Sequence, residues 1–237
     1  RKLQGLFLAT SVAAATPALA LEFRGTEWKG AGEIGYVATT GNTDTSNLAA
    51  KLGLTNEREH WRHNLVLEAL NTEDDGDTTA ERYLAVWQTD YKFSEHEYMF
   101  GRVAYEDDKF SGYEYRITEN IGYGRRVLNL ENMTLDLEAG PGARQSKLET
   151  GNTENEFVAR LAARYAWQIS ENSKFTQDLS SDIGEDATVT KSVTALQAKI
   201  NGNLAMKLTF TAKNTSDVPA GVDKTDTETG VTLVYGF

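Results

Sequence analysis

Apolar and polar residues alternate along most of the chain that follows Trp28. In residues 204–212, LAMKLTFTA, every second side chain is apolar, and Lys207 lies on the opposite face. Residues 157–169, FVARLAARYAWQI, repeat the pattern with arginines on the polar face. A period of two is the signal of a β-strand whose two faces meet different surroundings. The sequence therefore predicts an all-β protein.

About twelve strands of this kind are predicted, within a range of roughly ten to fourteen. Their starts lie near Trp28, Thr45, Trp61, Ala80, Tyr98, Tyr115, Met133, Asn155, Lys174, Thr190, Asn203 and Thr225. They recur about every 18 residues, which allows strands of roughly 10–12 residues joined by turns and loops. This spacing is typical of antiparallel transmembrane β-barrels.

The predicted connections fall into two alternating classes. One class is short and comprises residues 57–61, 94–98, 129–133, 170–174 and 201–203. The other class includes long acidic loops at residues 71–79, 106–114, 184–191 and 214–226. Two shorter members, at 40–43 and 150–153, read TGNT, and Gly-Asn between strands indicates a hairpin turn. Short turns at one end and longer loops at the other favour a barrel that spans a membrane.

Aromatic residues gather at the two predicted strand ends. Those beside the short turns are Trp61, Tyr91, Phe93, Tyr98, Phe100, Trp167 and Phe175. Those beside the long loops are Tyr83, Tyr105, Phe110, Tyr113, Tyr115 and Phe157. Two such belts match the interfacial girdles of membrane barrels, whereas a soluble sandwich would carry its aromatics in mid-strand.

The chain ends in GVTLVYGF, with Val231, Leu233, Tyr235 and Phe237 on every second position. We interpret this stripe as the outward face of the last strand of a barrel, with lipid as its apolar neighbour. The barrel has to be closed, because lipid offers no water to hydrogen-bond with the unpaired backbone groups of an open sheet edge. The stripe and its final Phe resemble the signal that the outer-membrane barrel assembly machinery recognises. We therefore expect a location in the outer membrane of a Gram-negative bacterium. Pro141 cannot donate a ladder hydrogen bond, and we expect a bulge or an early strand end there.

The first twenty residues predict a cleaved signal peptide. Arg1 and Lys2 precede an apolar run at residues 6–15, and an A-x-A sequence ends at Ala20. We expect export by the Sec pathway, a signal peptide at 1–20 and a barrel domain at 21–237. The chain has no cysteine, and its formal net charge of −11 argues against nucleic acid as a partner.

Several segments resemble the YdiY-like family of salt-induced outer-membrane proteins, whose function is unknown. The resemblance covers about residues 28–237, and the segments that carry it are TGNTDTSNLAAKLGL (40–54), TTAERY (78–83), EDDKFSGYEYR (106–116), LEAGPGAR (137–144) and SDVPAGVDKTDTETGVTLVYGF (216–237). The resemblance implies a barrel, an outer-membrane location and a link to salt or osmotic stress. It implies no catalytic or ligand residues.

A search for catalytic chemistry finds little. His60, His63 and His96 all lie at or beside predicted short turns, away from the long loops where an external substrate would arrive. No G-x-S-x-G sequence occurs. We expect no enzyme activity, no cofactor and no metal centre. The acidic segment EDDGD (73–77) could attract calcium, although it lacks EF-hand spacing. A weaker hypothesis is that the acidic loops hold divalent cations between lipopolysaccharide phosphates.

The strongest candidate site lies in the predicted lumen. Alternation points six charged side chains inward from three consecutive strands, basic, then acidic, then basic: Arg116 and Arg126, Asp136 and Glu138, Arg160 and Arg164. Charged rings that line a pore set its ion selectivity. The same groups could instead pair across strands and fill the interior.

Two functions therefore stay open. The first is a small outer-membrane channel that passes ions or small solutes through a charged lumen. The second is a plugged, structural barrel that stabilises the envelope and transports nothing. A soluble secreted sandwich and an outer-membrane hydrolase are further, weaker alternatives.

Overall fold

The computed structural model describes residues 28–40, 45–74, 77–109, 111–219 and 221–237, without the side chains of 37–47 and 72–80. The predicted signal peptide lies outside the described residues and stays a prediction. The twelve described strands are β1 (Trp28–Thr40), β2 (Thr45–Glu57), β3 (Trp61–Asp74), β4 (Asp77–Lys92), β5 (Glu97–Asp108), β6 (Tyr113–Asn129), β7 (Met133–Leu148), β8 (Thr153–Ser170), β9 (Ser173–Gly184), β10 (Thr188–Asn201), β11 (Leu204–Thr215) and β12 (Thr225–Gly236).

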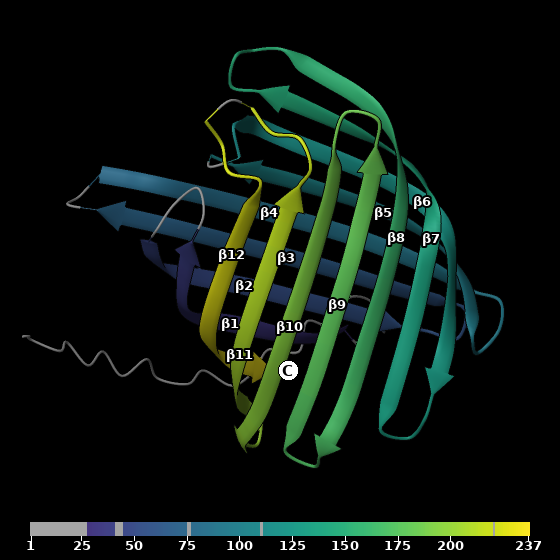
Figure 1. The fold of residues 1–237 in the computed structure, drawn as a ribbon. Coiled ribbons are helices and arrows are strands. Elements are labelled where there is room, and N and C mark those ends of the chain that lie inside the picture. The colour runs from purple at the N-terminus through teal and green to yellow at the C-terminus, as the bar shows by residue number, and fades with distance from the viewer. Residues whose placement is uncertain (1–27, 41–44, 75–76, 110, 220) are drawn as a thin grey trace, which may run out of the picture.

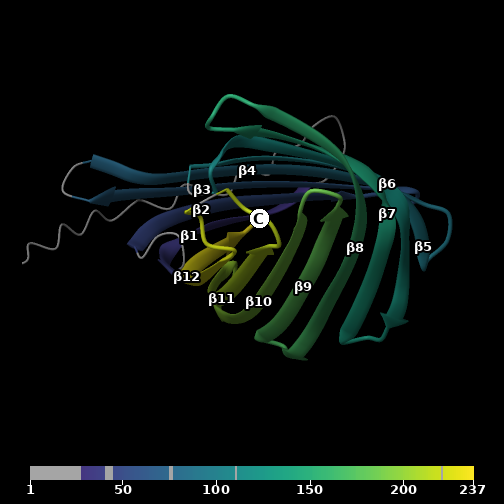
Figure 2. The ribbon, with the colours of Figure 1, turned by 45° about the horizontal axis from the view of Figure 1, so that its top comes forward.

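These strands form one closed antiparallel barrel, as the alternation predicts. Each strand pairs with its neighbours in sequence, and β12 pairs with β1 from Ala31–Gly236 to Thr40–Thr227. Figure 1 shows β2 to β5 along the back wall and β9 to β12 along the front, with β6 and β7 at the edge where the wall turns. Figure 2, turned by 45°, shows the same two walls. The described residues contain no helix long and apolar enough to cross a membrane.

Alternate side chains face opposite sides of the wall. In β5, Tyr98, Phe100 and Ala104 are buried, whereas Met99, Gly101 and Val103 are exposed. In β12, the outward Val231, Leu233 and Tyr235 are about half exposed. The barrel therefore carries apolar side chains outward and most of its charge inward, as a transmembrane barrel requires.

The prediction of several long loops is wrong. β3 runs to Asp74 and β4 starts at Asp77, so most of the predicted 71–79 loop is strand. The predicted loops at 106–114 and 184–191 are also largely strand, and among the described connections only that at 216–224 is long. The hydrogen-bonded pairing of two strands extends beyond their apolar residues, because the backbone groups of a hairpin pair with one another whether or not the side chains face an apolar phase.

The TGNT segment at 150–153 forms the predicted hairpin turn. Gly151 has a φ of +90°, which glycine adopts without strain, and its N–H donates to the carbonyl oxygen of Leu148 at 2.9 Å. The other TGNT segment, at 40–43, lies largely outside the described residues.

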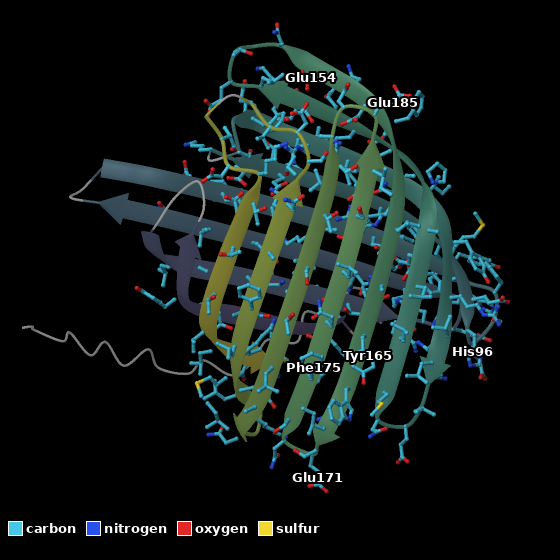
Figure 3. All side chains as sticks on the ribbon, viewed as in Figure 1. His96, Glu154, Tyr165, Glu171, Phe175 and Glu185 are labelled. Atoms are coloured by element: carbon cyan, nitrogen blue, oxygen red, sulfur yellow. The ribbon has the colours of Figure 1, made fainter. Side chains whose placement is uncertain are left out.

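The aromatic belts are only partly as predicted. Trp61, Tyr91 and Phe93 are exposed on the outer face beside the short turns, and Tyr83, Tyr105 and Phe157 are exposed towards the other end. Figure 3 shows Tyr165 and Phe175 side by side near the short turn that contains Glu171, with ring centroids 6.3 Å apart.

Three aromatic predictions are wrong and one is outside the described residues. Tyr98, Phe100 and Tyr113 are buried inside the barrel. Tyr98, Phe100 and Arg102 lie at every second position of β5, so their side chains share the inward face of the strand. Phe110 lies outside the described residues.

The expectation at Pro141 is also wrong, because β7 continues through it without a register shift. Pro141 pairs with Ala159 of β8, whereas the pairing with β6 stops at Asn120–Gly142 and resumes in the same register at Tyr123–Ala139. A Cβ on Gly140 would overlap the backbone of β6. Because Gly140 has no side chain, the backbones of β6 and β7 can approach each other closely at this point. Pro141 therefore interrupts the hydrogen-bonded pairing of β7 with β6 and leaves its pairing with β8 intact.

Candidate functional site: the charged lumen

A hydrogen-bonded network around Glu138 fills one side of the lumen. Glu138 of β7 accepts hydrogen bonds from Gln88 Nε2 at 2.8 Å and from the Tyr98 hydroxyl at 3.0 Å, and it forms an ion pair with Arg164. Gln88 also donates to Asp90, at 2.9 Å. Because these groups come from β4, β5, β7 and β8, the network ties two parts of the wall together.

The network continues into β3 and towards the short turns. The Nε of Arg62 donates to Asp90 at 2.6 Å, and its guanidinium lies 4.9 Å from the Tyr98 ring centroid. Nearby, Arg126 of β6 forms two parallel hydrogen bonds with Asp136 of β7, at 2.7 and 2.8 Å. Paired arginine–carboxylate contacts of this kind hold side chains in a fixed geometry.

Other ion pairs cross the lumen between distant strands. Lys213 of β11 lies 2.7 Å from Glu106 and 3.5 Å from Asp108, both in β5, which is half-way round the barrel from β11. Arg82 of β4 pairs with Glu228 of β12. These pairs bring opposite walls into contact and narrow the space between them.

Four cavities follow one another through the barrel. One of about 440 Å³ opens among Glu154, Glu185 and Asp217. Figure 3 shows Glu154 and Glu185 at the same end of the barrel. The cavity at the opposite end measures about 390 Å³ and is lined by Glu171, Asn172 and Gly202 among others. Between these mouths lie two smaller cavities of about 90 and 110 Å³.

Shared lining residues connect these cavities in order. Arg116 and Arg144 line both the 440 Å³ mouth and the 90 Å³ cavity. Lys191 lines both inner cavities, and Glu33 lines both the 110 Å³ cavity and the 390 Å³ mouth. The four cavities therefore lie one after another along the lumen, and the two smallest lie in the middle.

The 90 Å³ cavity, which we call the arginine cavity, carries an excess of positive charge. Its lining includes the acidic residues Glu106 and Asp182 and the basic residues Arg102, Arg116, Arg144, Arg160, Lys191 and Lys213. Glu106 is engaged by Lys213, and Asp182 by Arg160. No carboxylate of the described residues forms an ion pair within 4.0 Å with Arg102, Arg116 or Lys191.

The six predicted lumen residues all occupy inward positions but form two groups. Arg126, Asp136, Glu138 and Arg164 lie in or beside the network near the short turns. Arg116 and Arg160 line the arginine cavity instead. Arg160 pairs with Asp182 of β9 at 3.0 Å, and Arg116 stacks on Tyr113 with 4.2 Å from its central carbon to the ring centroid.

Sequence reasoning missed several lumen residues, among them Arg102, Lys191 and Lys213. Alternation along β5, β10 and β11 could have turned them inward, because each shares the parity of buried neighbours such as Ala104 and Ala195. No local signal could have paired Lys213 with Glu106, which precedes it by 107 residues.

The three histidines lie at or beside the short turns. His60 and His96 are exposed in turns. His63 lies within β3, stacked on Trp61 at 6.1 Å and within 3.0 Å of the Thr89 hydroxyl. The side chains of EDDGD (73–77) lie outside the described part of the chain, so calcium binding there stays a prediction.

The twelve-stranded closed barrel with a polar interior defines a porin-like β-barrel. The NanC porin superposes with a TM-score of 0.59 at 9% identity, covering 86% of this chain and 98% of that one. An outer membrane channel from Pseudomonas putida F1 gives a TM-score of 0.54 at 11% identity, covering 94% of this chain and 100% of that one. The translocator domain of autotransporter NalP from Neisseria meningitidis also gives 0.54, at 10% identity, with 92% and 91% of the two chains covered. This shared fold points to a bacterial outer-membrane location.

The chain belongs to the family described as "Protein of unknown function, DUF481", whose model matches residues 32–237. It is similar to "Uncharacterized protein YdiY" of Escherichia coli (strain K12), with 31% identity over 204 residues that cover 86% of this chain and 81% of that protein. The predicted resemblance to the YdiY-like family is therefore confirmed.

Proposed function

We propose that the protein is a narrow channel for small ions in a bacterial outer membrane, and that anions pass more readily than cations. The observation that carries this proposal is the series of four cavities that share lining residues from one mouth to the other. Charged side chains line each of the four cavities, so a hydrated ion would meet polar groups in every one of them.

The anion preference rests on the charge of the arginine cavity. Arg102, Arg116 and Lys191 carry charges that no nearby carboxylate of the described residues neutralises by an ion pair. Charges inside a narrow, partly desolvated passage act more strongly than those on the surface. The acidic residues at the mouth, such as Glu185 and Asp217, meet bulk solution, where salt screens charges beyond about 8 Å.

The lumen width limits the size of the solute. The two inner cavities hold only about 90 and 110 Å³. These are the two smallest of the four cavities along the lumen, and a solute that crosses the barrel has to pass both. We therefore propose ions and very small solutes as cargo. We also propose a role in salt or osmotic stress, which the family resemblance suggests.

The first test is single-channel current across a planar bilayer that contains the refolded protein. We expect discrete small steps and a reversal potential in a potassium chloride gradient that indicates anion preference. Neutralising Arg116 or Arg160 with glutamine should shift the reversal potential towards cation preference. Neutralising Arg125, which is exposed on β6 outside the lumen, should leave it unchanged. If R116Q and R160Q give current steps with an unchanged reversal potential, the arginine cavity does not set the ion selectivity.

The second candidate is a closed barrel that only stabilises the envelope. The ion pairs that cross the lumen, such as Lys213–Glu106, favour it because they hold opposite walls together. This candidate predicts no current from protein that is folded and inserted, as judged by heat-modifiable gel migration. Reproducible current steps would exclude it.

A further inference from the structure

We propose that the arginine cavity is a saturable binding site for one small oxyanion of phosphate size, a proposal that deepens the channel proposal above. Its lining comes from β4 to β11, and it lies next to the 440 Å³ mouth. Arg116 and Arg160 supply its principal donors. An anion that enters from this mouth meets Arg116 and Arg144 first, because both residues line the mouth and the cavity.

The first observation is a pair of buried donors without partners. The Nε atoms of Arg116 and Arg160 are buried, and no described residue accepts a hydrogen bond from either. Each of the two side chains belongs to a residue that is 7% exposed. A buried charged donor that makes no hydrogen bond is costly, so a small shift of either side chain towards an acceptor in the cavity would stabilise it.

The second observation is that each guanidinium is already held in place. The Arg116 guanidinium stacks on the Tyr113 ring at 4.2 Å. The Nη1 of Arg160 donates to both oxygens of Asp182, at 3.2 and 3.0 Å. These contacts fix the orientation of the guanidinium planes, and both Nε atoms lie buried beneath the cavity surface without an acceptor. A site of this kind binds with little loss of side-chain entropy.

The third observation is the surrounding polarity. Within the described part of the chain, the side-chain hydrogen bond of Arg102 is a long one, 3.5 Å to the Asn120 side-chain oxygen, which leaves most of its donors available. The hydroxyl-bearing Thr118 and Ser180 also line the cavity. Planar guanidinium groups suit the paired oxygens of phosphate and similar anions, whereas a spherical chloride uses fewer of these donors.

The cavity size selects a single small ion. At about 90 Å³ it is the smallest of the four cavities along the lumen, and its charged lining suits one small ion better than a chain of sugar units. A cation would meet uncompensated positive charge, because both carboxylates in the lining already pair with basic residues. The chemistry therefore favours an oxyanion over a cation or a neutral oligosaccharide.

The test is calorimetric titration of the refolded full chain in detergent micelles with inorganic phosphate, at constant ionic strength set by chloride. We expect one saturable site per chain. R116Q should weaken phosphate binding by about tenfold or more, because it removes a charged hydrogen bond to the anion. The control R125Q removes the same charge from the outer face of the same strand and should bind phosphate as the unmodified protein does.

R116K separates hydrogen-bond geometry from charge, because lysine keeps the charge and lacks the Nε donor. We expect R116K to bind phosphate more weakly than the unmodified protein and more strongly than R116Q. Heat-modifiable migration and circular dichroism check that each variant is folded. Absence of saturable phosphate binding, or equal binding by folded R116Q and R125Q, would overturn the site. The titration does not depend on ion current, so the two proposals can fail separately. If the folded protein binds phosphate but passes no current, the channel proposal is refuted and the binding site stands. If it passes current but binds no phosphate, the binding site is refuted and the channel proposal stands.

Discussion

Two aromatic residues of β5 fill the lumen by lying on glycines of the next strand. A Cβ on Gly124 would overlap the Tyr98 ring, and a Cβ on Gly122 would lie 2.7 Å from a carbon of the Phe100 ring. Phe100 is only 1% exposed, so it packs as tightly as a residue in a soluble core. The glycines of β6 therefore provide the space that lets inward aromatic rings lie flat against the wall.

This packing predicts a large effect of a small change at Gly124. Gly124→Val should lower the free energy of unfolding by about 1–3 kcal/mol, because the new side chain displaces Tyr98 from its hydrogen bond to Glu138. The measurement is urea unfolding in detergent, followed by the fluorescence of the four tryptophans. The matched control is Gly101→Val, because a Cβ on Gly101 meets no atom within 4 Å. Equal stability of the two variants would refute this account of the Tyr98 packing.

At the residue scale, the sequence predicts which face a side chain occupies but not which partner it meets. Alternation turns Arg160 inward correctly. Its partner Asp182 depends on the register between β8 and β9, where Arg160 lies opposite Asp182. That register follows from turn geometry and barrel stagger, which hydrophobic alternation alone leaves undetermined.

At the element scale, strand starts are better predicted than strand ends. The starts at Trp61, Met133 and Thr225 agree with the structure. The ends differ because pairing continues into acidic segments that read as loops, as in residues 106–114. Apolar periodicity marks the part of a strand that faces an apolar phase, whereas the hydrogen-bonded ladder stops only where the backbone turns.

The closing seam gives a prediction about one element. Phe237 exchanges two backbone hydrogen bonds with Gly30, each 2.8 Å long, beyond the last residue of β12. Removing Phe237 should lower the free energy of unfolding by about 1–3 kcal/mol, because Gly30 loses both partners. Urea unfolding of protein refolded in detergent, without the assembly machinery, measures this contribution directly.

The control is Phe237→Ala, which keeps both backbone bonds and removes the ring that lies over Gly30 and Leu54. We expect it to unfold close to the unmodified protein, since the ring faces outward, where detergent replaces its contacts. If Phe237→Ala is as unstable as the deletion, the ring and not the backbone holds the seam.

At the scale of the whole molecule, the lumen is shaped by contacts between strands that are far apart in sequence and round the barrel. Lys213 reaches Glu106 and Asp108 across the lumen, and Arg82 reaches Glu228. Strand number alone does not determine such contacts, because barrels of similar size can be open or filled. The sequence could therefore predict a charged lumen but not its width.

The Lys213 pair predicts a coupling between stability and lumen width. Lys213→Met should lower the free energy of unfolding by about 3–5 kcal/mol, because Glu106 and Asp108 lose the cation that they share inside the barrel. The double variant Lys213→Met/Glu106→Gln should recover a large part of this loss, because it removes one of the two carboxylates. Urea unfolding compares the three proteins, and planar-bilayer current compares their conductance.

The two candidate functions make different predictions for the double variant. If the barrel is a channel, weaker contact between β5 and β11 should widen the passage and raise the single-channel current. If the barrel is closed by many contacts, the variant should stay silent while its stability recovers. Lys109→Met is the control, because Lys109 follows β5 on the exposed surface and pairs there with Glu81 of β4, where an ion pair contributes little. A loss of stability in Lys109→Met as large as that in Lys213→Met would show that the effect comes from lost charge and not from the lumen contact.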